Sequence, residues 1–434
     1  MNVGLISLGC AKNLVDSEFI LGILQTAGCQ IVSDPDEADA IIINTCGFIE
    51  SAKQETIETI REMKEYGKKL IVCGCYAQRY KEKLMVEMPF IDRIITLQEY
   101  PKIHLILSNL FRDSDLKFQP LRYEYRMLTG SVFSPYVKIS EGCDNRCTYC
   151  AIPLIRGDFR SRNYQEIIDE CKKLAKAGAK EINLIGQDTT KYGMDLHEGK
   201  LLEDLIREIT DIPGVFLVRV LYLYPDEITD SLLEEIRNNP KVAKYFDIPI
   251  QHISSPILRR MNRRGDEAFL STLLLKIRKM IPEAIFRTTL IVGFPGETEQ
   301  DFEKLVEFVR EFQFDRLGAF AYSKEDDTRA FAFPDQVEAE VKQKRLDTIM
   351  KVQSKAAWKK NRGQIGKTHM VLVEAYDEES KFYYGRSYAF APDDIDGYIV
   401  FQSLMPLNIG DVTNVLIKDS IRYDLIGDAL SEVR

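Results

Sequence analysis

Two long stretches of the chain alternate short apolar runs with amphipathic segments, and this alternation constrains the fold more than any other feature. In residues 1–115, apolar runs that are typical of strands occupy residues 3–8, 39–45 and 68–74. Segments with helical spacing follow them, over residues 14–27, 51–64 and 80–88. Apolar strands that alternate with amphipathic helices indicate a parallel sheet covered on both faces. We therefore expect an α/β N-terminal domain built on a parallel sheet.

The second alternation, in residues 129–359, contains six expected strands. They are predicted at residues 136–140, 182–185, 216–222, 246–250, 287–292 and 317–321. Six strand–helix units are too few for a closed eight-stranded barrel, so we expect an open, partial (β/α)6 barrel of the TIM type. A polar helix is expected to follow at about residues 337–360. Residues 362–434 contain short strand-like runs between Gly, Pro and Asp, which predicts a small all-β antiparallel barrel.

Cysteine usage and charge limit the class of protein. The chain has 434 residues, nine cysteines and a net charge of −9. An odd number of cysteines argues against a disulfide framework and favours metal ligation or catalysis, although Cys29 and Cys171 are expected to be core residues. No apolar run is long enough to span a bilayer, and no basic residue precedes the short apolar stretch at the start. We therefore expect a cytoplasmic protein with no membrane partner.

The acidic balance bears on the choice of partner. Residues 362–434 contain seven Lys and Arg against 12 Asp and Glu. A surface that grips nucleic acid usually presents basic charge to the phosphates, so direct nucleic-acid binding is not expected and a basic protein partner fits better. Two groups of arginines either contact a substrate or RNA, or form solvated ion pairs: Arg156, Arg160 and Arg162, and Arg259, Arg260, Arg263 and Arg264.

Three cysteines lie on one loop after the first strand of the expected partial barrel. Cys143, Cys147 and Cys150 have the spacing C-x-x-x-C-x-x-C, within EGCDNRCTYCAIPLIRG. Thiolates are the usual ligands of iron–sulfur clusters, and a [4Fe–4S] cluster normally takes four of them. Three thiolates leave one iron open, which can bind the amino and carboxylate groups of S-adenosylmethionine. A zinc site is the alternative, but zinc fingers usually use two ligand pairs and no second pair lies nearby.

A second trio of cysteines follows the three expected N-terminal strands. Cys10, Cys46 and Cys75 each come just after a strand. The carboxyl ends of parallel strands share one edge of a sheet, so these thiols are expected to converge and to hold a second [4Fe–4S] cluster. Cys73 is an alternative ligand because it is two residues away, but Cys75 is preferred because it follows Gly74.

These motifs, taken together, resemble the methylthiotransferase family of radical S-adenosylmethionine enzymes along the whole chain. The residues that carry the resemblance are 7–18 (SLGCAKNLVDSE), 138–157 (KISEGCDNRCTYCAIPLIRG), 186–193 (GQDTTKYG) and 385–397 (GRSYAFAPDDIDG). They are similar to the branch that modifies an aspartate of the twelfth small-subunit ribosomal protein. The tRNA-modifying branch typically reads GCQMN and GQNVN instead. The resemblance implies a methylthiotransferase N-terminal domain at 1–115, a radical S-adenosylmethionine core at 129–359 and a TRAM domain at 362–434.

The resemblance also implies contacts to S-adenosylmethionine. Tyr149 matches the aromatic position that lies beside the adenine in the family. Gln187 and Asp188 lie where the family contacts the methionine amino group, although GQD departs from the common Gly-Gly-Glu. The GFPGET segment, residues 293–298, looks like a further loop on the cofactor side, or else a turn that leads into a helix capped by Thr298.

The reaction that the resemblance implies uses two molecules of S-adenosylmethionine. One donates its methyl group to sulfur at the N-terminal cluster, and the other is cleaved reductively at the second cluster. The resulting radical removes hydrogen from the β-carbon of the substrate aspartate, and that carbon takes up the methylthio group. No catalytic residue beyond the cluster ligands is expected, because an unactivated C–H bond offers a general base no useful acid.

The implied partners are a small-subunit ribosomal protein, free or in the subunit, an electron donor and a sulfur donor. Two alternatives remain at this point. One is a tRNA adenosine methylthiotransferase. The other is a non-catalytic iron–sulfur or zinc protein that docks through its acidic β domain.

Overall fold

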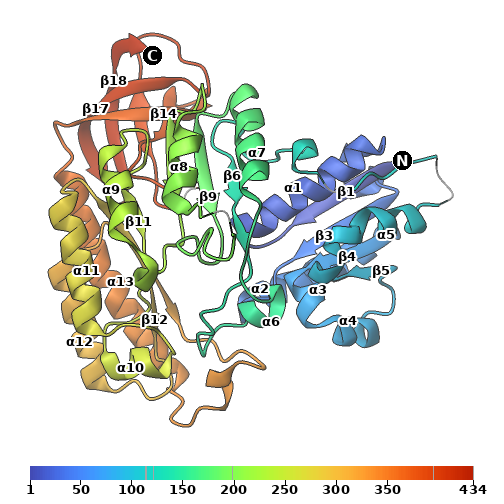
Figure 1. The fold of residues 1–434 in the computed structure, drawn as a ribbon, viewed down its shortest axis with the longest axis horizontal. Helices are drawn as coiled ribbons and strands as arrows, with labels where there is room; N and C mark the ends of the chain where they lie inside the picture. The colour runs from blue at the N-terminus through green and yellow to red at the C-terminus, as the bar shows by residue number, and fades with distance from the viewer. Residues whose placement is uncertain (113–114, 121, 198, 394, 434) are drawn as a thin grey trace.

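The protein folds into three units in chain order, which are seen in a computed structural model that describes residues 1–112, 115–120, 122–197, 199–393 and 395–433 (Figure 1). Residues 113 and 114, at the predicted end of the first domain, and residue 394, within the 385–397 motif, lie outside the described residues. In Figure 1 the blue N-terminal unit lies at one side, and the red C-terminal barrel lies beside the central unit. None of the helices in the described ranges is long and apolar enough to cross a membrane.

The N-terminal unit is a parallel sheet with the strand order β2-β1-β3-β4-β5. Its strands are β1 (Asn2–Ser7), β2 (Gln30–Val32), β3 (Ala40–Thr45), β4 (Lys69–Gly74) and β5 (Arg93–Ile95). Its helices are α1 (Ala11–Thr26), α2 (Glu50–Lys64), α3 (Cys75–Arg79), α4 (Lys81–Glu87) and α5 (Ile103–Leu110). Alternate residues of β4 pack on opposite faces, with Ile71 against α1 and α5 and Val72 against α2. The predicted doubly covered sheet is therefore confirmed.

The central unit contains the six expected strands, all parallel to their neighbours. They are β6 (Tyr136–Lys138), β9 (Glu181–Ile185), β10 (Leu217–Val220), β11 (Tyr245–Asp247), β12 (Ile285–Val292) and β13 (Arg316–Ala321). They form two sheets, β10-β9-β6 and β11-β12-β13. An isolated β-bridge between Val218 and Val242 links the two sheets. The predicted partial barrel is confirmed, with a weaker seam at its middle than a continuous sheet would have.

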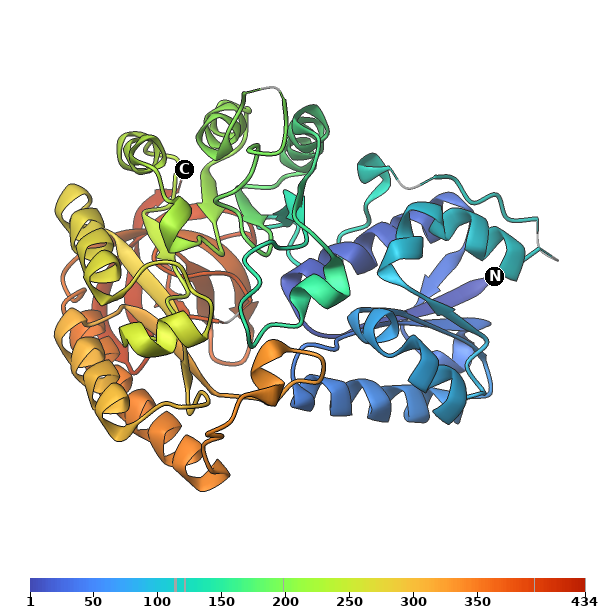
Figure 2. The same ribbon diagram turned by 60° about the horizontal axis from the view of Figure 1, so that its bottom comes forward.

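Helices cover the outer side of these strands, as Figure 2 shows in green to orange. They are α7 (Tyr164–Lys176), α8 (Leu202–Thr210), α9 (Asp230–Asn238), α11 (Glu267–Met280), α12 (Glu299–Phe312) and α13 (Ala339–Arg362). The short helix α10 (Ser255–Arg260) lies at the end of the strands instead, where the Arg260 carbonyl accepts from the Thr148 hydroxyl. Between β6 and α7 the chain forms the short antiparallel pair β7 (Ser140–Glu141) and β8 (Arg160–Ser161), which brackets α6 (Ile152–Arg156). This bracketed segment contains the central cysteine loop.

The C-terminal unit is a closed barrel with the strand order β14-β15-β16-β18-β17. Its strands are β14 (Thr368–Asp377), β15 (Phe382–Arg386), β16 (Ile399–Gln402), β17 (Val412–Ile421) and β18 (Asp424–Val433). The small all-β barrel is confirmed, but it is not wholly antiparallel, because β16 pairs with β18 in parallel. The chain forms β17 before β18, and β18 rather than β17 lies beside β16. The two strands β16 and β18 therefore run in the same direction.

The 385–397 motif joins the C-terminal barrel to the starts of the central strands. Arg386 donates to the buried carboxylate of Glu181 at 2.8 Å, and Arg219 donates to the other oxygen of that carboxylate at 2.8 Å. The Tyr136 hydroxyl donates to Asp393 at 2.5 Å. A sequence motif that carried the family resemblance is therefore a structural joint between two units.

Ion pairs also fix the N-terminal unit to the central unit at several places. Glu18 of α1 pairs with Arg126, which precedes β6. The buried carboxylate of Glu325 accepts from Lys53 of α2 and from Arg79 of α3, each at 3.0 Å. Figure 2 shows the orange segment that follows β13 reaching across to the blue helices of the N-terminal unit. The two units thus meet over a polar, ion-paired surface beside both cysteine trios.

Candidate functional site at the domain junction

The three N-terminal cysteines lie at one edge of the parallel sheet. Cys10 precedes α1, Cys46 follows β3 and Cys75 begins α3 directly after β4. Because β1, β3 and β4 are adjacent strands, their carboxyl ends bring these residues together. Gly9 has a φ of +91°, and a Cβ atom added there would lie 2.9 Å from the Cys46 Sγ. The backbone beside Cys10 therefore needs glycine in order to pass Cys46.

Cys73 and Cys75 face different surroundings although only one residue separates them. Cys73 lies in the apolar core between the sheet, α1 and α5, beside Ile71 and Ile95. Burial raises the pKa of its thiol to about 12. Cys75 instead packs against Ala151 and against α6 of the central unit. Only Cys75 of this pair lies at the domain junction.

Arg156, the last residue of α6, is buried at the centre of this junction. Its Nη2 donates to the Cys75 Sγ at 3.4 Å and to Asp16 at 3.0 Å. Its Nη1 donates to Glu141 at 2.9 Å. Desolvation alone would raise the pKa of the Cys10 thiol, but the Lys12 ammonium and the Arg156 guanidinium outweigh it, so this pKa is lowered. Arg156 thus forms ion pairs at a helix end, as one of the two sequence-based expectations had it, but it is buried and not solvated.

The central trio lies on the loop between β7 and α6. The Cys143 backbone N–H donates to the Gly157 carbonyl at 3.1 Å, and the Cys150 N–H donates to the Cys147 carbonyl at 3.1 Å. Burial raises the pKa of Cys143 to about 11 and raises that of Cys150 further above its ordinary value. These thiols need a strong local cation, such as cluster iron, in order to ionise.

Tyr224, which sequence reasoning missed, and Arg263, whose contact with a cysteine it did not predict, adjoin the middle cysteine of this trio. The Tyr224 hydroxyl lies 3.7 Å from the Cys147 Sγ, and Arg263 Nη1 lies 3.9 Å from it. The guanidinium of Arg263 also lies 4.0 Å from the centre of the Tyr224 ring. Arg263 is buried, whereas Arg264 is exposed and pairs with Glu227 at 3.0 Å. The expectation of a solvated arginine cluster therefore holds for Arg264 and fails for Arg263.

The other arginines of the two groups divide in the same way. Arg162 is buried and pairs with Glu170 at 2.8 Å, Arg260 is half-buried, and Arg160 and Arg259 are exposed. The signal that could have identified Arg156 was its position six residues after Cys150, inside a motif that already carried the cluster prediction. No comparable signal exists for Arg263, because it reaches Cys147 only through the fold.

The predicted contacts to S-adenosylmethionine surround the same loop. The Tyr149 ring packs edge-on against Phe294 of the 293–298 segment, with ring centres 6.4 Å apart. Gln187 Nε2 donates to Glu141 at 3.2 Å. The buried Asp188 carboxylate accepts from Asn145 of the cysteine loop at 2.8 Å, and burial raises its pKa. Asp188 therefore braces the cysteine loop in this structure.

The surroundings of the loop fit a polar cofactor. Among the described residues, the Ser140 Oγ, the Asn145 Oδ1 and the Gln187 Oε1 are buried and have no hydrogen-bond partner. Buried polar atoms are rarely left unpaired in a finished structure, so these atoms suit a polar ligand. No three His, Cys, Asp or Glu side chains within the described ranges converge on a single metal-ion position. A cubane cluster takes its thiolates at separate irons, so each trio still suits one in donor chemistry.

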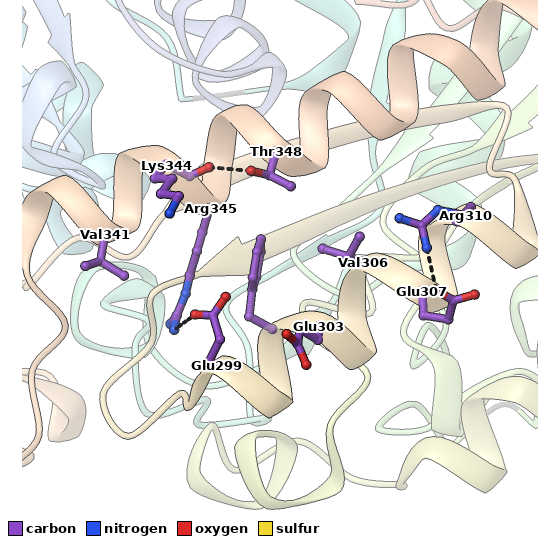
Figure 3. A pocket seen from close by; sticks show the side chains of 10 residues that line it. Glu299, Glu303, Val306, Glu307, Arg310, Val341, Lys344, Arg345 and Thr348 are labelled. Carbon is purple, nitrogen blue, oxygen red and sulfur yellow. Dashed lines mark hydrogen bonds and ion pairs between the residues drawn. The ribbon is translucent and has the colours of Figure 1, made fainter.

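The 293–298 segment has the local structure of a turn and a helix cap. Thr298 caps α12, and its hydroxyl and backbone exchange hydrogen bonds with Asp301. Farther along, α12 and α13 enclose a groove of about 600 Å³ that is lined by Glu299, Phe302 and Val341, among others (Figure 3). Arg345 crosses it to pair with Glu299 at 3.1 Å. None of the predicted site residues lines this groove.

Comparison with known proteins identifies families and relatives that this chain resembles. Residues 2–96 match the uncharacterized protein family UPF0004, residues 137–309 match the radical SAM superfamily and residues 365–430 match the TRAM domain. The chain is 47% identical to the ribosomal protein uS12 methylthiotransferase RimO of Acetivibrio thermocellus, over 99% of this chain and 98% of that one. It is 46% identical to the RimO of Clostridioides difficile, over 100% of both chains.

Solved structures with little sequence similarity share the fold. TsrM from Kitasatospora setae, a radical S-adenosylmethionine methyltransferase with cobalamin and a [4Fe–4S] cluster bound, has a TM-score of 0.52 at 14% identity, over 74% of each chain. OxsB, a cobalamin-dependent S-adenosylmethionine radical enzyme, has a TM-score of 0.52 at 13% identity, over 81% of this chain and 56% of that one. At these identities the likeness concerns the fold alone.

Proposed function

The chain belongs to the RimO family of radical S-adenosylmethionine methylthiotransferases, and we propose that it attaches a methylthio group to the β-carbon of an aspartate in ribosomal protein uS12. Membership of the radical SAM superfamily brings S-adenosylmethionine and a [4Fe–4S] cluster as cofactors. The observation that carries the proposal is the meeting of two cysteine trios at one junction, where Arg156 contacts Cys75 from the end of the helix that follows the central trio.

The proposal assigns each trio to its own [4Fe–4S] cluster. Cys143, Cys147 and Cys150 hold the cluster that binds S-adenosylmethionine, with Tyr149, Gln187 and Asp188 as its cofactor contacts. Cys10, Cys46 and Cys75 hold the second cluster. The three domains are placed at residues 1–115, 129–359 and 362–434.

The side chains around the trios have supporting roles in this proposal. When bound, the clusters and S-adenosylmethionine supply the radical chemistry that exchanges an unactivated C–H bond for a C–S bond. Arg156 holds a positive charge against Cys75, and Asp188 fixes the cysteine loop through Asn145. No side chain is assigned as a catalytic base, because such a C–H bond gives a base no useful proton.

The acidic C-terminal barrel suits a basic ribosomal protein. Residues 362–434 carry seven Lys and Arg against 12 Asp and Glu, and opposite charges speed encounter and favour the correct orientation. An electron donor and a sulfur donor complete the set of proposed partners. A ribosomal substrate also places the reaction in the cytoplasm.

Mass spectrometry of cells with and without this protein tests the proposal. We expect the uS12 peptide that contains the aspartate to lose its methylthio group in a deletion strain and to regain it on complementation. Methylthiolated adenosine in tRNA should stay unchanged in the same samples. A deletion strain that loses the tRNA modification and retains modified uS12 would contradict the proposal.

Arg263 offers a separate test of the cluster assignment. We expect Arg263→Met to shift the midpoint potential of the cluster at the central trio to a more negative value, by tens of millivolts. Loss of a buried positive charge and of an N–H near the Cys147 sulfur favours the oxidised cluster. An anaerobic redox titration followed by electron paramagnetic resonance measures this shift.

The neighbouring residue provides the control for that titration. Arg264→Met removes the same charge from an exposed position that pairs with Asp226 and Glu227, so the potential should stay close to that of the unaltered protein. Equal shifts in the two variants would mean that Arg263 acts only through the overall charge of the protein.

A further inference from the structure

A pocket of about 570 Å³ lies at the seam between the central unit and the C-terminal barrel. Its walls come from the end of α11, the starts of β12 and β13, the end of α13 and the start of β14. None of the residues assigned above to clusters or to S-adenosylmethionine lines it, although part of its lining belongs to the C-terminal barrel. Its charged lining comprises Arg278, Arg316, Lys360 and Lys367, with Glu283 and Asp315.

Two arginines place N–H groups in this seam without an acceptor. Arg316 is only 7% exposed, and its Nη1 donates to the Asn361 Oδ1 at 3.4 Å, but its Nε has no partner among the described residues. Arg278 Nη1 donates to the Phe312 carbonyl at 2.8 Å, while its buried Nη2 likewise finds no acceptor in the part of the chain described. A buried charged donor without an acceptor is costly, so these groups suit an oxygen ligand.

Positive charge exceeds negative charge within the enclosed part of the seam. Asp315 is the carboxylate closest to these cations, and Lys360 contacts its Oδ1 at 2.9 Å. The other oxygen of Asp315 accepts from the Phe286 backbone N–H at 3.0 Å. The Asp315 carboxylate is thus the nearby negative charge for three cations, Arg278, Arg316 and Lys360. Burial lowers the pKa of Lys360, and the nearby charges of Arg278 and Arg316 lower it further, although Asp315 opposes this.

The two guanidinium groups are held in place by aromatic rings. Arg278 lies 3.9 Å from the ring centre of Phe312, and Arg316 lies 4.5 Å from that of Phe390. A guanidinium that is fixed in this way loses little entropy when it binds an anion, and its N–H groups match the oxygens of a phosphate. The seam therefore contains fixed, positively charged N–H donors of the kind that bind oxyanions.

We propose that this pocket binds a phosphate group, as inorganic phosphate or as the phosphate of a small metabolite, through Arg278, Arg316 and Lys360. Its volume of about 570 Å³ leaves room for a small anion. The acidic barrel that forms one wall disfavours a long polyanion such as RNA. Because its lining comes from both units, the bound anion strengthens the joint between them. This inference does not depend on the proposed methylthio transfer.

Isothermal titration calorimetry tests the site. The cluster-loaded protein is titrated with inorganic phosphate, and with chloride at the same ionic strength as a control. We expect one phosphate to bind per chain and to raise the melting temperature. A titration with a phosphorylated sugar then distinguishes a small metabolite from free phosphate as the preferred source. Binding of an RNA oligonucleotide without any binding of inorganic phosphate or the sugar would overturn the proposal.

Two substitutions locate the bound phosphate. Arg278→Gln should weaken phosphate binding by about tenfold or more, because it removes a charge-assisted hydrogen bond from a partly buried site. Lys360→Gln should have a similar effect, and it covers the case in which the first variant does not fold. Arg310→Gln, on the exposed face of α12, is the matched control and should leave binding unchanged. Unchanged phosphate binding in both seam variants would also overturn the proposal.

Discussion

Replacement of Cys75 by alanine is expected to remove about half of the cluster iron and to abolish methylthio transfer, because one of the two proposed [4Fe–4S] clusters loses a ligand. The altered protein should still cleave S-adenosylmethionine to 5′-deoxyadenosine, since Cys143, Cys147 and Cys150 are untouched. Iron analysis, absorption spectra after anaerobic reconstitution and product analysis by mass spectrometry measure these effects. Together they separate loss of the second cluster from loss of the whole fold.

Cys73 supplies a matched control two residues away. Both cysteines are buried, but Cys73 lies in the apolar core between the sheet, α1 and α5. Cys73→Ala should retain all of the iron and the activity, and should cost only about 1 kcal/mol in stability through the lost sulfur atom. A protein that loses its second cluster with Cys73→Ala and keeps it with Cys75→Ala would reverse the assignment.

The sequence predicts the units of the fold well because their patterns are local. Six apolar runs in the central unit become β6 and β9–β13, and the polar segment near 337–360 becomes α13. The edge strand β5 was not predicted, since three residues carry little periodicity. The parallel pairing of β16 with β18 also depends on how the chain closes the barrel, which no short pattern records.

The candidate site likewise contains residues that local patterns predict and residues that only the folded chain brings together. The gathering of Cys10, Cys46 and Cys75 follows from strand order, which the alternation of strands and helices indicates. The burial of Arg156 does not follow from its own neighbours, because its partners Asp16 and Glu141 come from different units. A charged residue is buried only where the fold supplies counter-charges, so these positions had to be seen in the structure.

Glu181→Gln is expected to lower the free energy of unfolding by about 3–5 kcal/mol, because it leaves Arg219 buried without this counter-charge and Arg386 with Glu374 alone. The side chain of each partner is at most 3% exposed, so solvent cannot replace the lost carboxylate. Urea unfolding followed by the fluorescence of Trp358, the one tryptophan of the chain, measures the change. Glu307→Gln, which removes an exposed pair with Arg310, should alter stability by less than about 1 kcal/mol.

The pKa of the Glu181 carboxylate determines how acid weakens the joint between the central unit and the C-terminal barrel. Burial alone would raise the pKa of Glu181, but Arg386 and Arg219 outweigh it and lower the pKa to about 2. Because the pKa is lower in the folded protein than in the unfolded chain, where it is about 4.5, the contribution is complete above pH 4.5. It is then lost as the pH falls toward about 2. Glu181→Gln should remove this part of the acid dependence, and an acid limb identical in both proteins would show that Glu181 does not hold the joint.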